Sequence, residues 1–243
     1  MLTHELPPRD DRSDNFRHLA GMIVAVAQHY DISVDTTTEQ RWNDCLGLLR
    51  EFDTLVDDYD VPHQQALAAL RDFTPFAANY PSMRPEVVGG ATHQIMVSRV
   101  ERILQLGRTI SRTTNPEEFI TARCEEVEQT AYLLADCAHG DTTTQPGFYT
   151  QFMPALCSMG RAANTVDSLV DMRQDIHQEK ITIRPSAQLL AGLGRVALGE
   201  MARTGPRIAH RDVWRHFAAM GLARVRHRVR HGNQPYSSLH NMR

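Results

Sequence analysis

Residues 164–175 have the sequence NTVDSLVDMRQD. A spacing of four places Asp167, Asp171 and Asp175 on one face of an α-helix, with Asn164 about one turn earlier. Three apolar residues lie among these acids, namely Val166, Leu169 and Val170. The stretch therefore predicts a helix with a row of carboxylates that has apolar side chains on both sides, which differs from an ordinary surface stripe.

A second acidic helix face lies earlier in the chain, where residues 50–60 have the sequence REFDTLVDDYD. At the helical period Asp53, Asp57 and Asp60 fall within a narrow arc, whereas Asp58 points elsewhere. Carboxylates stacked in this way repel one another, and exposed helices usually dilute such repulsion with lysines. Because only Arg50 shares this side, a bound divalent cation is the natural way to remove the repulsion.

These two acidic faces together predict a magnesium site. Mg²⁺ keeps several waters and takes one or two carboxylates plus phosphate oxygens. Two facing helices would hold a cluster of Mg²⁺ ions that grips a diphosphate and withdraws charge as a carbon–oxygen bond breaks. Arginines and Lys180, the only lysine in the chain, could contact the same phosphates. A single DxxxD is more often a solvated stripe, but two such faces favour the metal site.

Helical periodicity extends over most of the remaining chain, and no segment alternates like a strand between hairpin turns. A capping box is expected at Thr36 and Glu39, and Pro154 and Gly160 are expected to kink the longest helix. The predicted helices cover residues 13–30, 36 to 61, a short helix ending at 70, 93–106, 116–138, 147–178, 185–203 and 212–230. We therefore predict an all-α fold, a single compact bundle of about eight helices over residues 1–243, with flexible tails at 1–12 and 232–243.

Composition limits the class of protein. A hydrophobic fraction of 42% with 23% charged residues is ordinary for a globular domain, and a net charge of -3 argues against a general nucleic-acid binder. The four cysteines form no CxxC pair, so buried free thiols are expected rather than a zinc site. No apolar run approaches the roughly twenty residues of a membrane span, and none resembles a signal peptide. A cytoplasmic protein without a transmembrane segment is expected.

The two acidic segments resemble the paired aspartate motifs of class I isoprenoid synthases. Residues 53–57, DTLVD, resemble the first motif of the phytoene and squalene synthase branch. Residues 167–175, followed by Glu179, Lys180 and Ile181, resemble the second motif of that branch and its trailing basic-plus-isoleucine segment. The second segment is also similar to the second motif of bacterial large-terpene synthases. The resemblance covers the two motifs, their order and the all-helical setting.

This resemblance implies an isoprenoid-synthase-like bundle with a central cavity, a Mg²⁺ cluster and a prenyl diphosphate substrate. The implied metal ligands are Asp53, Asp57, Asp167, Asp171 and Asp175, of which Asp53, Asp57 and Asp171 are predicted to be catalytic. Asp60, which shares the first acidic face, is a further predicted metal ligand. Asn164 and Lys180 are the predicted contacts of the diphosphate. Aromatic faces stabilise carbocations, so Phe52, Phe148 and Phe152 are predicted to contact the substrate, although core packing is the simpler interpretation of each.

The leading hypothesis is a terpene synthase that ionises one prenyl diphosphate and then cyclises the carbocation or quenches it. Prenyl transfer joining two isoprenoid units is the alternative within the same fold, but the chain is short for an enzyme that holds two such substrates. An all-α nucleotide pyrophosphohydrolase is a second alternative, although such sites favour ExxE patterns, which Glu125, Glu126 and Glu128 only imitate. A helical interaction protein is the non-enzyme alternative. Dimers are common in the resembled family, so a homodimer is possible.

Overall fold

The computed structural model describes residues 13–57 and 61–204. This part of the chain contains eight α-helices and no strand, which confirms the predicted all-α bundle. The predicted helix over 212–230 and the two predicted tails lie outside the described residues. The helices are α1 (Ser13–His29), α2 (Thr36–Asp57), α3 (His63–Asp72), α4 (Pro85–Val88), α5 (Gly90–Arg112), α6 (Pro116–Cys137), α7 (Met153–His177) and α8 (Ala187–Thr204), with short helical turns at Pro81–Met83, Thr142–Thr144 and Phe148–Phe152.

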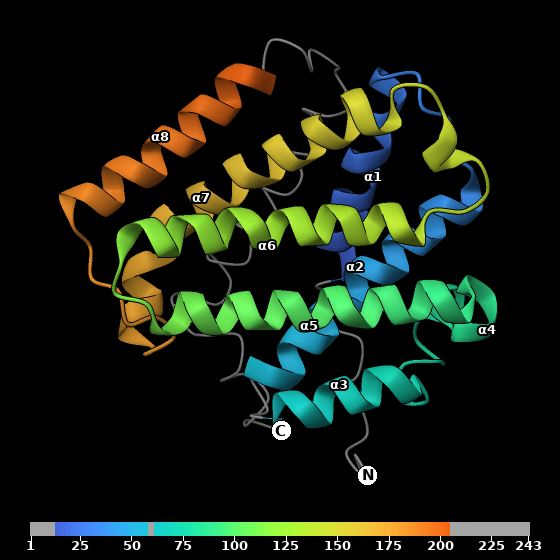
Figure 1. Cartoon of the computed structure of the whole chain (residues 1–243), viewed down its shortest axis with the longest axis horizontal. Coiled ribbons are helices and arrows are strands. Elements are labelled where there is room, and N and C mark those ends of the chain that lie inside the picture. The colour runs from blue at the N-terminus through green and yellow to red at the C-terminus, as the bar shows by residue number, and fades with distance from the viewer. Residues whose placement is uncertain (1–12, 58–60, 205–243) are drawn as a thin grey trace.

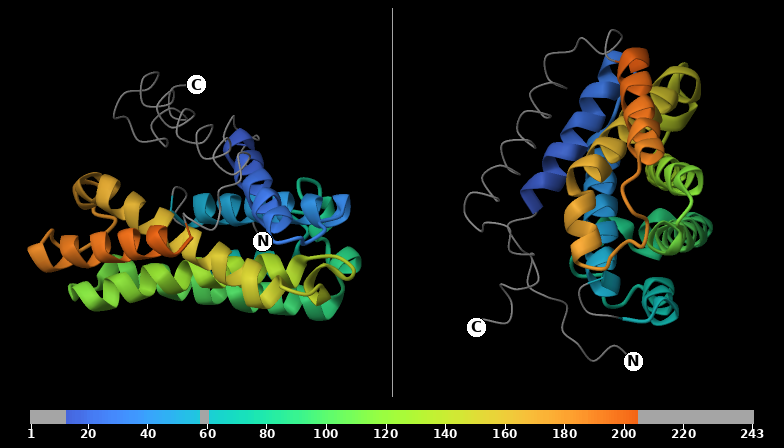
Figure 2. Two further views of the ribbon diagram at one scale, coloured as in Figure 1. Left: turned by 90° about the horizontal axis from the view of Figure 1, so that it is seen from above. Right: turned by 90° about the vertical axis from the view of Figure 1, so that its left-hand side faces the viewer.

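Helix α6 is the centre of the bundle, because it contacts α2, α5, α7 and α8. It lies antiparallel to α5 in the front layer of the molecule, and α7 and α8 pack together beside it (Figure 1). Helices α1 and α2 lie behind that layer, as the view from above shows (Figure 2). No helix in residues 13–57 or 61–204 combines the length and the apolar character that crossing a membrane requires.

The N-terminus of α2 is capped by Asp35, one residue before the predicted capping box at Thr36, so that prediction is wrong by one position. The carboxylate of Asp35 accepts the Thr38 N–H at 2.6 Å and lies 3.1 Å from Nδ1 of His139. These contacts lower the pKa of Asp35 from 3.8 to about 2, with the bond from the Thr38 backbone contributing most. The cap thereby joins the start of α2 to the loop after α6.

Trp42 connects three elements in the larger of two apolar clusters. Its indole N–H donates to the Leu134 carbonyl of α6 at 2.8 Å, and its ring stacks on Phe152 with centroids 6.1 Å apart. A smaller cluster joins the end of α5 and the start of α6 to α7 and α8, through residues that include Phe119 and Met172. The four cysteines are free; Cys45, Cys137 and Cys157 are buried and Cys124 is half-buried, which largely confirms the predicted buried thiols.

The predicted long helix over 147–178 is divided into a π-helical turn, Phe148–Phe152, and α7. Pro154 lies in the first turn of α7, where its missing N–H costs no hydrogen bond. Gly160 serves packing: a Cβ added there would overlap Cγ1 of Val127 on α6. The absence of a side chain at Gly160 therefore lets α6 and α7 approach closely, which accounts for this glycine without the predicted kink.

Gly160→Ala should lower the free energy of unfolding by about 1–3 kcal/mol, because Val127 is branched at Cβ and has little rotameric freedom on a helix. Urea denaturation would measure this. Gly194→Ala is the matched control, since no atom lies within 4 Å of a Cβ built there on α8. Adding Val127→Ala to Gly160→Ala should restore part of the loss. Equal stability of the Gly160→Ala and Gly194→Ala proteins would contradict the close approach.

Candidate functional site

The C-terminal half of α7 carries the second acidic face of the sequence. Asp167 is exposed, whereas Asp171 and Asp175 are half-buried. Met172, next to Asp171, is only 2% exposed and anchors this part of α7 in the smaller apolar cluster. Val170, which was predicted to be an apolar flank, is 54% exposed. The predicted row of carboxylates is therefore not uniform: Asp167 is exposed to solvent, whereas Asp171 and Asp175 are partly desolvated.

Asp175 lies in a mixed electrostatic environment. Burial raises its pKa above the ordinary value of 3.8, Arg123 opposes this rise, Asp171 adds to it and Lys180 opposes it; the net change is upward. No ion pair with a described residue neutralises this carboxylate. Asp175 therefore interacts electrostatically with Arg123 of α6, Asp171 of α7 and Lys180 of the following turn. The group contains two acids and two bases.

The turn after α7 keeps Lys180 close to Asp175. Glu179 adopts a left-handed conformation with φ of 57°, and the Lys180 N–H donates to the Asp175 carbonyl at 2.8 Å. This is the pattern of a helix C-cap. The chain is then fixed by buried Ile181 and by Thr182, whose N–H and hydroxyl both donate to the Ser111 carbonyl, at 3.0 and 2.8 Å.

Arg123 is the residue of this group that the sequence did not locate. Its Nη1 donates to Glu126 at 3.3 Å, and its guanidinium lies 5.6 Å from the centroid of the Phe119 ring. Its Nε is buried and has no hydrogen-bond partner among the described residues. The predicted ligand Asn164 donates its amide to the Arg123 carbonyl at 3.0 Å and to Glu126 at 3.3 Å, so it joins α7 to the same turn of α6.

The first acidic face is only partly described. Asp53 is exposed and pairs with Arg50 at 2.5 Å. Asp57 is the last residue of α2, but its side chain and all of Asp60 lie outside the description. Helices α2 and α7 run in the same direction, with their C-terminal ends toward the left in Figure 1 and in the left view of Figure 2. That the two acidic faces oppose each other stays a prediction.

The three predicted aromatic contacts, Phe52, Phe148 and Phe152, lie in the larger apolar cluster and are at most 3% exposed. Phe148 packs on Phe152 with ring centroids 5.2 Å apart, and Phe152 stacks on Trp42. Their surroundings are those of ordinary core packing, which was the simpler interpretation. Contact between these rings and a substrate stays a prediction.

No group of three or more potential metal ligands is assembled within residues 13–57 and 61–204. Magnesium needs fewer, since it takes one or two carboxylates and completes its shell with water and phosphate oxygens. Asp171 and Asp175 fit that requirement because they lie on successive turns, are half-buried and repel each other. The chemistry of the pair therefore suits a hard divalent cation that arrives together with an anion.

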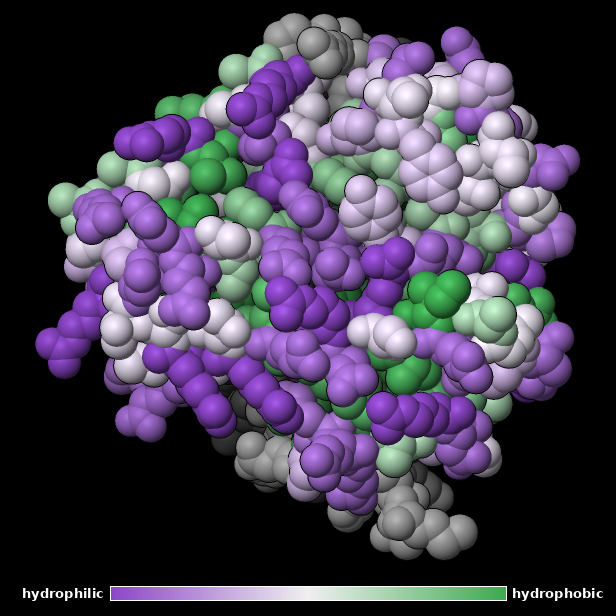
Figure 3. Space-filling view, viewed as in Figure 1, coloured by the Kyte–Doolittle hydropathy of each residue, from purple (hydrophilic) through white to green (hydrophobic). Residues whose placement is uncertain are grey.

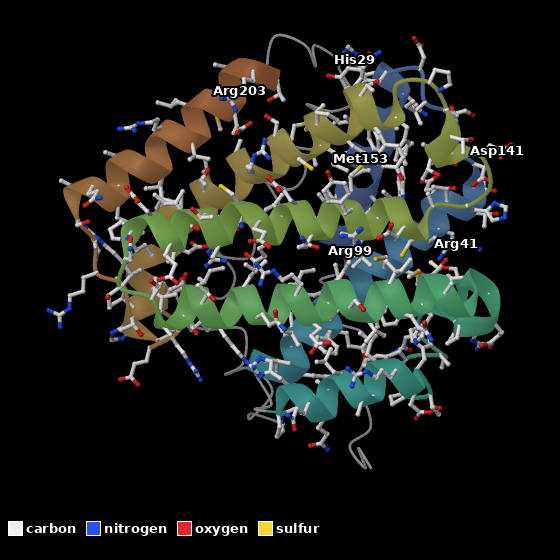
Figure 4. The ribbon with its side chains drawn as sticks, viewed as in Figure 1. His29, Arg41, Arg99, Asp141, Met153 and Arg203 are labelled. Atoms are coloured by element: carbon white, nitrogen blue, oxygen red, sulfur yellow. The ribbon has the colours of Figure 1, made fainter. Side chains whose placement is uncertain are left out.

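A second polar cluster, around Arg161 and about three turns before Asp171 on α7, was not predicted. Arg161 pairs with Glu128 of α6 at 2.6 Å and with Glu200 of α8 at 3.2 Å, and the Ser158 hydroxyl donates to Glu200. Arg203, at the end of α8 (Figure 4), adds a bond to Glu200 at 3.0 Å. A usable signal existed in the sequence, because Glu200 occupies a buried position in line with three apolar residues of the helix: Leu189, Leu193 and Ala197.

Comparison of the chain with protein families, with curated proteins and with solved structures found no match.

Glu200→Gln should destabilise the protein by about 1–3 kcal/mol at neutral pH. Burial acts to raise the pKa of Glu200, but the bonds from Ser158 and Arg161 outweigh it and hold the pKa below 4.5. A lowered folded-state pKa stabilises the protein above the unfolded value, and this contribution disappears as pH falls through the folded value. The difference between wild type and variant should therefore shrink below pH 4.5.

Urea titrations at several pH values would measure this difference, with exposed Glu179→Gln as the control that changes little. A loss of the same size at neutral and acidic pH would show that the charge of Glu200 does not stabilise the helix contact.

Proposed function

We propose that this chain is a magnesium-dependent class I terpene synthase that ionises a prenyl diphosphate at the C-terminal half of α7. The observation that supports this most is the half-buried pair Asp171 and Asp175 on successive turns of α7, beside two bases, Arg123 and Lys180. Acids alone would suit any divalent cation. Acids beside bases suit a metal cation that is bound together with a phosphate group.

Each residue has a distinct task in this proposal. Asp171 and Asp175 bind Mg²⁺, which supplies Lewis-acid stabilisation to the leaving diphosphate. Arg123 and Lys180 hold diphosphate oxygens, and Arg123 is suited to bidentate contact because its planar guanidinium retains an unpartnered Nε. The carbon–oxygen bond then breaks with its electron pair on the diphosphate. The carbocation that remains loses a proton or adds water, with or without ring closure.

The nucleotide pyrophosphohydrolase alternative is less well supported, because its candidate glutamates are already engaged in ion pairs with arginines. Glu125 pairs with Arg102 at 2.6 Å and Glu126 with Arg123 at 3.3 Å. Glu128 pairs with Arg161 at 2.6 Å. A carboxylate that binds catalytic metal would have to leave such a pair. Prenyl transfer uses the same acids and bases as the leading proposal, so only the product separates these two reactions.

The test is turnover of geranyl, farnesyl and geranylgeranyl diphosphates with and without Mg²⁺, measured as pyrophosphate release and as hydrocarbon product by gas chromatography. Asp171→Asn and Asp175→Asn should each lower turnover by about 100-fold or more, because Lewis-acid assistance is worth several kcal/mol. Exposed Asp72→Asn, at the end of α3, should retain activity.

Magnesium should also raise the melting temperature of the wild type but not that of Asp171→Asn. If Mg²⁺ stabilises the protein and no prenyl diphosphate is consumed, the metal site holds and the substrate is wrong; nucleoside triphosphates would then be tested. If neither effect is seen, the proposal is refuted and the interaction-protein alternative remains.

A further inference from the structure

The N-terminus of α5 is an uncapped helix end. Gly89 occupies the cap position with φ of 92°, and no side chain from the described part of the chain caps the first turn. The N–H groups of Gly90, Ala91 and Thr92 therefore have no intrahelical acceptor. Because α5 is 23 residues long, the partial positive charge at this end is fully developed. An oxyanion is the ligand that such a helix end favours.

Arg41 of α2 is a buried cation at the same place. It is 8% exposed, and its Nη2 donates to the Val87 carbonyl at 3.1 Å. Its Nε is buried and has no hydrogen-bond partner within residues 13–57 and 61–204. None of the carboxylates in the described part of the chain forms an ion pair with it. Asp44, one turn along α2, instead accepts bonds from Ser82 and from Gln40. A buried charge without a counterion is costly, typically by several kcal/mol.

These two features meet at one end of the molecule. Val87, which accepts from Arg41, lies two residues before Gly89, and Figure 4 shows Arg41 where α5 begins and α6 ends. A Cβ built on Gly89 or Gly90 would meet no atom within 4 Å, so the backbone is open to a ligand. Val87 and Ile95 are exposed apolar side chains near this helix end. Polar and apolar residues are mixed on this face of the molecule (Figure 3).

We propose that Arg41 and the first N–H groups of α5 bind an oxyanion of the phosphate type. The anion would neutralise Arg41 and cap α5 at once, which no described side chain does. This site is separate from the acidic pair of α7, because the N-terminus of α5 and the C-terminus of α7 lie at opposite ends of the bundle (Figure 1). The phosphate is either free or part of a lipid headgroup, since both present the same oxygens.

The experiment titrates the full chain with inorganic phosphate by calorimetry and by thermal shift. EDTA is present so that the acidic pair of α7 contributes no metal-dependent binding, and sodium chloride keeps the ionic strength constant. Phosphate should bind the wild type and raise its melting temperature. Arg41→Met should bind phosphate at least about tenfold more weakly, because it lacks the charge-assisted contact.

Without phosphate, the Arg41→Met protein should melt at or above the wild-type temperature, because a buried unpaired cation has been replaced by an apolar chain of similar length. A purely structural Arg41 predicts the reverse, a lower melting temperature and an unchanged phosphate response. Ala91→Glu is an independent surface variant. Its carboxylate would occupy the first turn of α5, stabilise the helix and abolish the phosphate response. Exposed Arg195→Met on α8 is the matched control and should respond as the wild type does.

Vesicles of phosphatidylcholine with and without phosphatidic acid separate the two sources of the anion. Binding to phosphatidic acid that Arg41→Met abolishes supports a headgroup, whereas binding of inorganic phosphate alone supports a free ion. The proposal is overturned if the wild type does not respond to phosphate, or if Arg41→Met and Ala91→Glu respond as the wild type does.

Discussion

The close antiparallel contact between α6 and α7 is the constraint on which the candidate site depends. Gly160 removes the side chain that would hold the helices apart at Val127. The approach then allows the Asn164 amide to reach the backbone of Arg123 at 3.0 Å, about one turn further along α7. Asn164 thereby fixes the turn of α6 that carries Arg123, whose charge acts to lower the pKa of Asp175. If α6 and α7 lay further apart, each of these polar contacts would lengthen. The electrostatic interactions of Asp175 would then weaken, because they fall with distance.

The polar groups at the contacts of α7 with α6 and α8 are of two kinds. Arg161, Glu128 and Glu200 satisfy one another, with Ser158 completing the set, so their desolvation is offset within the protein. Asp175 has no such direct partner, and its raised pKa records the difference. Proteins retain a desolvated and unpaired carboxylate at a cost, and this cost is common where a ligand is to be bound. The paired cluster holds the helices together, whereas Asp175, which forms no ion pair with a described residue, is the carboxylate that the proposed cation would neutralise.

The sequence could predict the helices and the closeness of Lys180 to the second acidic face, because both follow from spacing within a few turns of chain. It could not predict that Arg123 joins that face, since helical periodicity defines a face but not the helix that packs on it. The same limit explains Glu200, whose register marked it as buried while its partners lie on α6 and α7. Asp35 displaced Thr36 as the cap because His139, distant in sequence, also binds it. Whether Phe52, Phe148 and Phe152 touch a substrate depends on space between helices, which spacing does not encode.

Charged groups at the two ends of the molecule have different surroundings. At the C-terminal half of α7, burial and Asp171 raise the pKa of Asp175, whereas Arg123 and Lys180 oppose the rise. At the start of α5 there is an excess of positive charge, since a helix N-terminus and Arg41 lie together without a carboxylate pair among the described residues. The proposals for the two ends of the bundle therefore rest on different observations, a partly desolvated carboxylate on α7 and a buried arginine beside the N-terminus of α5.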